Sequence, residues 1–118
     1  MERTLFHATS FGGFSNLQPG DEVTLVPGKQ NAQGVGVYFS EGEPDVRASD
    51  SVFEGGLVAI FKVEICTDRS WYKSKGGMDR VKSRPKTWHS NNKDVRLSIL
   101  SVIREDGHNT YLCKGTVV

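Results

Sequence analysis

Two short segments of the chain combine polar or aromatic side chains with strand-like surroundings. The first, Leu5-Phe6-His7-Ala8-Thr9-Ser10, places an imidazole and two hydroxyls at the end of an apolar run. The second, Gly34-Val35-Gly36-Val37-Tyr38-Phe39-Ser40, places a tyrosine and a serine after two glycines. Imidazole can hydrogen-bond a ligand hydroxyl, tyrosine can stack on a planar ring, and strand glycines indicate a close approach to the backbone. The pair is therefore the first candidate for a ligand site.

The common nucleotide, metal and hydrolase motifs are missing from the chain. The sequence contains no G-x-x-x-x-G-K-[ST] segment, no Cys/His spacing suited to zinc and no G-x-S-x-G elbow. Gly34-Val35-Gly36 begins a G-x-G pattern, but no third glycine follows at the required place. We therefore expect no metal site and no Rossmann-type dinucleotide site.

The elements that must position these residues are short and mostly extended. Residues 40–44 resemble a helix entry, with Ser40 as the cap, so a helix is predicted over 44–52. Asp106-Gly107-His108-Asn109 predicts a hairpin turn between the last two strands. We predict one α+β domain over residues 1–118, with about six short strands in a split or antiparallel β core and one or two short helices. The expected strands cover 3–7, 23–26, 35–40, 57–65, 95–103 and 110–117.

The two segments together resemble the signature of the ADP-ribosyltransferase superfamily. In its diphtheria-toxin-like and poly(ADP-ribose) polymerase-like branch, His-Gly-[Ser/Thr] on a first strand precedes a Gly-x-Tyr-[Phe/Leu]-[Ser/Thr] strand. The chain is most similar to the small rifamycin-modifying transferases, which share its length and a turn like Leu17-Gln18-Pro19-Gly20-Asp21. The resemblance covers roughly residues 3–104 and is strong over 3–65.

This resemblance implies NAD as the co-substrate and gives roles to five residues. His7 would hydrogen-bond the adenosine ribose, and Thr9 would offer a hydroxyl to the same sugar. Ala8 stands where glycine usually grips the nicotinamide amide with its backbone. Tyr38 would stack on the nicotinamide ring, and Ser40 would hydrogen-bond near it. The reaction would pass through an oxocarbenium-like transition state, as glycoside hydrolysis does.

The family also uses a carboxylate, which stabilises the ribosyl cation. Asp79, in Gly76-Gly77-Met78-Asp79-Arg80, is the first candidate, because its separation from Tyr38 is near that of the rifamycin-modifying type. Asp94, Glu105 and Glu64 are the alternatives, and the absence of a catalytic carboxylate is another. The identity of this residue stays open at this point.

Residues 67–94 are polar and too long for an ordinary connection. The stretch 69–96 carries nine Lys or Arg and two Asp, which suits an anionic ligand or a solvated loop. Arg84 and Lys86 could bind the pyrophosphate of NAD or could lie at the surface. Trp71 and Trp88 could wall an acceptor pocket or anchor the loop to the core.

The predicted function is mono-ADP-ribosyl transfer from NAD to a protein side chain or a small molecule, as in small toxins, effectors and resistance enzymes. A catalytically inactive nucleotide- or protein-binding module is the alternative, and nucleic acid is a less favoured partner. No signal peptide or membrane span is evident, and Cys66 and Cys113 read as buried thiols without a disulfide. We therefore expect a cytoplasmic protein.

Overall fold

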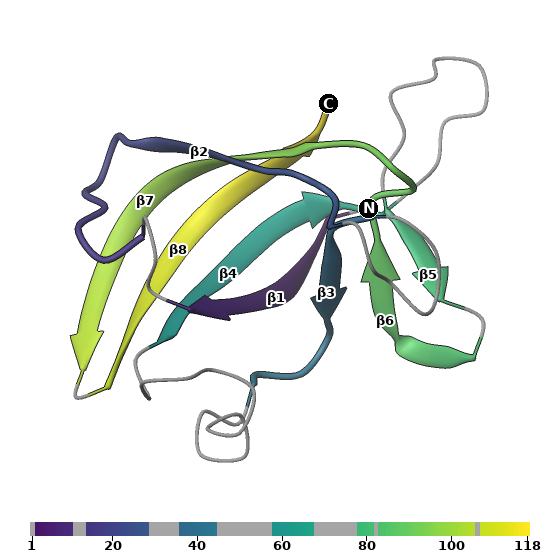
Figure 1. The fold of residues 1–118 in the computed structure, drawn as a ribbon, viewed down its shortest axis with the longest axis horizontal. Coiled ribbons are helices and arrows are strands. Elements are labelled where there is room, and N and C mark those ends of the chain that lie inside the picture. The colour runs from purple at the N-terminus through teal and green to yellow at the C-terminus, as the bar shows by residue number, and fades with distance from the viewer. Residues whose placement is uncertain are drawn as a thin grey trace.

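The chain forms one mixed sheet of eight strands in the order β2-β7-β8-β4-β1-β3-β6-β5. The structure is a computed structural model that describes residues 2–10, 14–28, 36–44, 58–67, 78–81, 83–105 and 107–118. Neighbouring strands are antiparallel except β4 and β8, which run parallel. Figure 1 shows the long strands side by side, with β3, β6 and β5 at the far end of the sheet. The strands are β1 (Glu2–Ser10), β2 (Glu22–Leu25), β3 (Tyr38–Ser40), β4 (Val58–Cys66), β5 (Asp79–Val81), β6 (Arg84–His89), β7 (Val95–Glu105) and β8 (His108–Val117).

One face of the sheet forms the hydrophobic core. Side chains alternate between the two faces of a strand, so β4 buries Phe61, Val63 and Ile65 while Lys62 and Glu64 are exposed. The neighbouring strands follow the same alternation. Every strand except β5 contributes buried side chains to one cluster, which also takes in Val37 and Met78 from outside the strands.

The sheet curls around this core. Edge strand β2 is separated from β1 by β7, β8 and β4 in the strand order. Val23 and Leu25 of β2 nevertheless share the core cluster with Phe39 of β3 and Trp88 of β6. The two ends of the sheet therefore come toward each other across its concave face, as the twist of a large sheet allows.

The predicted hairpin between the last two strands is confirmed. Glu105 pairs with His108, and Gly107 has a φ of 82°. An Asp-Gly pair suits such a two-residue turn because glycine adopts positive φ without a steric penalty.

The predicted α+β fold class is wrong, because the described part of the chain contains strands and no helix. Of the helix expected over 44–52, only Pro44 lies within the described residues. The strands expected near 3–7, 23–26, 35–40, 57–65, 95–103 and 110–117 all have counterparts, with shifted ends. The described chain therefore has eight strands in one sheet, not about six in a split core.

The segment 67–94 supplies the two unexpected strands, β5 and β6. Trp88 of β6 is buried and anchors this hairpin to the core, whereas Trp71 lies outside the described residues.

Neither cysteine is disulfide-bonded. Cys66 is exposed rather than buried as predicted, whereas Cys113 is buried, and burial raises its pKa to about 12. Within the described residues, no helix is long and apolar enough to cross a membrane.

Candidate functional site

His7 lies on the concave face of the sheet. β1 alternates, so His7 shares the face of buried Leu5, and its ring lies 5.4 Å from the ring of Phe39 and 6.4 Å from that of Phe61. Burial among these rings lowers the pKa of His7 below its ordinary value of 6.5, and the Tyr38 carbonyl only partly opposes this. The imidazole is therefore neutral at physiological pH.

The neutral ring has a defined tautomer. Its Nδ1 lies 2.7 Å from the backbone carbonyl oxygen of Tyr38. A carbonyl oxygen only accepts hydrogen bonds, so Nδ1 carries the proton and donates it. Nε2 is then an unprotonated acceptor, which suits a hydroxyl donor on a ligand.

The Tyr38 side chain lies on the other face of the sheet. Phe6 of β1 pairs with Ser40 of β3, and paired residues share a face. His7 follows Phe6 and therefore points to the opposite face, whereas Tyr38 lies two residues from Ser40 and shares its face. The Tyr38 ring stacks on His89 instead, at 5.7 Å between centroids and 24° between planes. His7 and Tyr38 therefore meet through the backbone of Tyr38.

The surroundings of Gly36 explain why a glycine stands at this position before Tyr38. A Cβ added there would lie 3.2 Å from Cβ and from Nδ1 of His89 and 3.3 Å from the backbone N of Asn91. His89 is held in place because its Nδ1 accepts a hydrogen bond from the Asn91 N–H at 3.1 Å. The close approach expected at this glycine is thus to His89.

His7 opens into a pocket of about 400 Å³ between β1, β2 and β3. Thr9 and Thr24 bring polar atoms to it, and Phe14 brings an aromatic wall. The volume is near the lower end for ligand sites, so the pocket suits one nucleoside half of a dinucleotide. Its described lining consists of His7, Thr9, Phe14, Thr24, Leu25, Val26, Gly28, Gly36, Val37 and Tyr38.

Phe14 was not expected in the site and is fixed by contacts with the core. Its ring meets Phe61 edge to face at 5.4 Å. The buried Tyr111 hydroxyl donates to the Phe14 carbonyl and accepts from Asn109 Nδ2 at 3.1 Å, and the same Nδ2 also donates to the Ser15 carbonyl at 3.2 Å. The sequence offered no signal for this wall, because Phe14 stands in a segment without periodicity.

Ala8 and Ser40 lie apart from His7. Ala8 pairs with Ile60 and points away from the concave face, so only its backbone could face a ligand near His7. Ser40 donates from its hydroxyl to the carbonyl of Gly42 at 2.9 Å, which stabilises the turn after β3. Of the five residues expected to hold NAD, the structure brings His7, Thr9 and Tyr38 to the pocket.

Asp79 stands in a row with His89 and Tyr38. His89 of β6 pairs with Asp79 on one side and with Tyr38 on the other, so the three residues share one face. This is the face opposite His7, and Asp79 is not among the described residues that line the pocket. The carboxylate is therefore near Tyr38 but separated from His7 by the sheet.

The other three candidate carboxylates also lie outside the described lining of the pocket. Glu64 is exposed on β4, rather than paired in a buried strand, and borders a separate hollow on the outer face. Asp94 is exposed before β7, and the exposed Glu105 carboxylate lies 3.3 Å from Nε2 of His108. None of them is among the described residues that line the His7 pocket.

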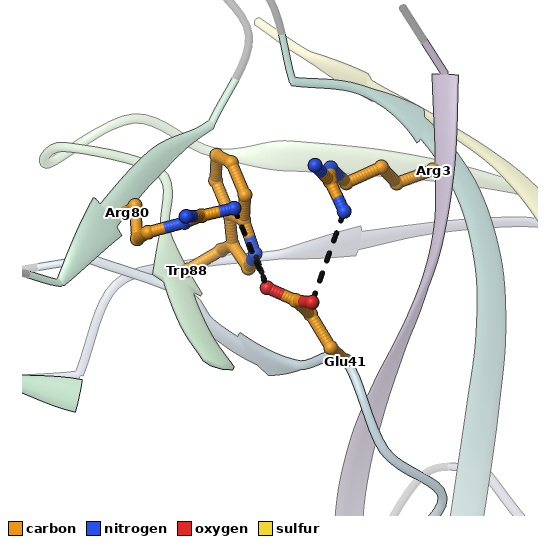
Figure 2. Close-up of polar contacts among 4 residues, drawn as sticks. All are labelled: Arg3, Glu41, Arg80 and Trp88. Carbon is orange, nitrogen blue, oxygen red and sulfur yellow. Dashed lines mark hydrogen bonds and ion pairs between the residues drawn. The ribbon is translucent and has the colours of Figure 1, made fainter. Parts of the chain in front are cut away.

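Arg84 and Lys86 are exposed on β6 and likewise do not line the pocket. The same strand carries Trp88, which forms a cluster with Arg3, Glu41 and Arg80 (Figure 2). Trp88 Nε1 donates to Glu41 at 2.9 Å, and Glu41 also pairs with Arg3 and Arg80 at 3.7 Å each. Sequence reasoning missed this cluster, because only the strand order brings the four residues together.

Among the described residues, no group of three or more His, Cys, Asp or Glu side chains is placed to hold a metal ion. Comparisons of the chain with protein-family models, with curated proteins and with solved structures found no match.

Proposed function

We propose that the chain binds NAD at the His7 pocket and transfers ADP-ribose from it to a protein side chain or a small molecule. The observation that carries this proposal is the neutral His7 ring, whose Nδ1 donates to Tyr38 and whose Nε2 is left as an acceptor. A ribose hydroxyl is the donor that such an atom would hold. The two motifs that resemble the transferases contribute to the same pocket.

The neutral state of His7 suits the chemistry. The bond between the nicotinamide nitrogen and C1′ of the ribose breaks, and nicotinamide leaves as a neutral molecule. The acceptor then bonds to C1′ and loses its proton to solvent. Positive charge develops on the nicotinamide ribose, so a protonated imidazole on the adenosine ribose of the same NAD would add an unfavourable charge, whereas a neutral one holds the adenosine ribose hydroxyl without repulsion.

Two aromatic residues could face the nicotinamide ring. The Tyr38 ring was expected there, but it stacks on His89 from the other face. Phe14 lines the pocket and offers an apolar ring surface on the concave side. We therefore assign the contact with the planar nicotinamide ring to Phe14. The role of Tyr38 is to orient the His7 ring through its backbone carbonyl.

Asp79 is the carboxylate we propose for catalysis. It is half-buried, and only His89 separates it from Tyr38 in the row across β5, β6 and β3. Asp79 lies on the face opposite the His7 pocket, so we propose that it acts through His89 and Tyr38 as a positioning residue. We also place the activity in the cytoplasm, in keeping with two cysteines that form no disulfide.

Two observations favour a second function, a nucleotide-binding module without turnover. Ala8 stands where the related transferases have glycine, and Asp79 does not line the His7 pocket in the described part of the chain. In this alternative NAD binds and leaves unchanged.

The test measures nicotinamide released from NAD by the parent, His7→Ala, Phe14→Ala, Tyr38→Ala and Asp79→Ala proteins, together with NAD binding by calorimetry. His108→Ala is the matched control, because His108 lies on β8 beside Glu105. Transfer predicts release that falls in the His7, Phe14 and Asp79 variants and persists in the control. Binding without release would favour the module, and the absence of both would overturn the NAD proposal.

A further inference from the structure

A cationic surface is formed by residues of β1, β5 and β6, none of which is among the described residues that line the His7 pocket. Arg3 of β1 and Arg80 of β5 flank the Trp88 ring, with guanidinium carbons 5.4 Å and 4.8 Å from the ring centroid (Figure 2). Lys86 lies two residues before Trp88 on β6 and by alternation shares its face, and Arg84 is the exposed first residue of the same strand. We call Arg3, Arg80, Arg84 and Lys86 the cationic surface.

The two arginines are held in place while keeping their donors available. Glu41 lies 3.7 Å from each, which is an ion pair rather than a close hydrogen bond. Its short contact, at 2.9 Å, is with Trp88 Nε1. Among the described residues, the buried Arg3 Nε has no hydrogen-bond partner. The ring and the carboxylate thus orient the two guanidinium groups, whose side chains remain 37% and 46% exposed.

Among the described residues, few carboxylates lie near this surface. Glu41 and Glu43 follow β3 beside it, whereas alternation turns Glu2 and Asp79 to the opposite face. Within the described residues, neither the Arg84 nor the Lys86 side chain forms an ion pair. In the described part of the chain, four cationic side chains therefore lie near two carboxylates, and one of these, Glu41, accepts the hydrogen bond from Trp88.

We propose that the cationic surface binds the phosphate backbone of a double-stranded nucleic acid, independently of the NAD pocket. Fixed guanidinium groups suit phosphate oxygens because they present paired donors in a plane. Trp88 is 7% exposed, so it cannot serve as a stacking platform for unpaired bases. The contacts would read charge and not base sequence.

The test is fluorescence anisotropy with labelled DNA and RNA duplexes of mixed sequence, across a series of salt concentrations and without NAD. The account predicts duplex binding that weakens with salt, with a Kd of about 10⁻⁶–10⁻⁴ M near physiological salt. In an Arg84→Ala/Lys86→Ala double variant, the slope of log K against log salt should shrink by about 2.

The matched control is Arg96→Ala/Lys114→Ala, which removes the same charge from exposed positions of β7 and β8. It should change the slope less than the Arg84/Lys86 pair, and unfolding curves should show both variants folded. Equal effects of the two variants, or no duplex binding at low salt, would overturn the proposal. Tighter binding of single strands, or of a phosphoserine peptide at equal phosphate concentration, would also overturn it.

Discussion

The imidazole of His7 donates a hydrogen bond of 2.7 Å to the backbone carbonyl of Tyr38, while the side chains of the two residues occupy opposite faces of the sheet. This arrangement makes Tyr38 part of the site through its backbone. It fixes the tautomer of His7 and leaves Nε2 as an acceptor in the pocket.

Protonation of His7 should lower the stability of the protein at acid pH. The pKa of His7 is lowered in the folded protein, so below its ordinary value of 6.5 the unfolded chain binds a proton that the folded protein does not. The contribution of His7 to the free energy of unfolding should therefore be fully present above pH 6.5. It should fall by at most about 1.4 kcal/mol for each pH unit as the pH drops from 6.5 toward the folded-state pKa. Urea unfolding of the parent and of His7→Gln measures this, and equal pH dependence in the two proteins would contradict it.

Gly36→Ala should weaken the candidate site more than it weakens the fold. The added methyl would lie 3.2 Å from His89 and 3.3 Å from the Asn91 backbone, so the strand segment before Tyr38 must shift by a few tenths of an ångström. NAD affinity, measured by calorimetry, should fall, because the shift moves the carbonyl that orients His7. Gly42→Ala, where no atom lies within 4 Å, is the control, and equal affinity in both variants would argue against this role of Gly36.

Gly115→Ala should destabilise the core. The new Cβ would lie 2.6 Å from Val63 Cγ1 and 3.1 Å from Ile65 Cδ1, inside a packed region of β4 and β8. Overpacking of this kind costs about 1–3 kcal/mol. Chemical denaturation should show that loss for Gly115→Ala and almost none for Gly42→Ala. An unchanged free energy of unfolding for Gly115→Ala would contradict the prediction and would mean that β4 and β8 separate easily.

Glu41 should contribute to stability through Trp88 more than through the arginines. The side chains of Arg3 and Arg80 are 37% and 46% exposed, and exposed pairs contribute about 0–1 kcal/mol. The hydrogen bond from Trp88 to the charged carboxylate contributes about 1.5–3 kcal/mol. Glu41→Ala should therefore cost clearly more than Glu41→Gln, whose amide oxygen can still accept from Trp88. Unfolding curves in which both cost the same would reverse this ranking.

Tyr111→Phe should destabilise the protein and loosen the Phe14 wall of the pocket. The buried Tyr111 hydroxyl bonds the Phe14 carbonyl and Asn109, so its removal leaves a buried amide and a carbonyl short of a partner. The expected loss is about 1–3 kcal/mol. Thermal or urea unfolding measures this loss. A change within about 0.5 kcal/mol, the size of ordinary surface effects, would contradict the prediction.

Local patterns predicted much of the sheet, because strands and hairpin turns leave local signals. The apolar runs around 57–65, 95–103 and 110–117 correspond to β4, β7 and β8, and Gly107 lies in the expected turn. The strands β5 and β6 were missed because Arg84, Pro85 and Lys86 read as a polar loop. β6 is defined instead by its partners β3 and β5 and by the burial of Trp88, which are non-local features.

The sequence singled out two residues that border the pocket, but it did not give the geometry of the pocket. The types and order of His7 and Tyr38 indicated a common pocket, and both border it. The face that each side chain occupies depends on the register of β1 against β3, and sequence spacing does not give that register. For the same reason, Asp79 could be assigned a distance in sequence from Tyr38 but not a face of the sheet.

Long-range ¹H–¹⁵N NMR of the His7 ring, with and without NAD, tests the account most directly. The account predicts a neutral imidazole protonated at Nδ1, with an Nε2 resonance that shifts when NAD is added and is absent from the spectrum of His7→Gln. A ring protonated at Nε2, or a His7 resonance that does not respond to saturating NAD, would contradict it.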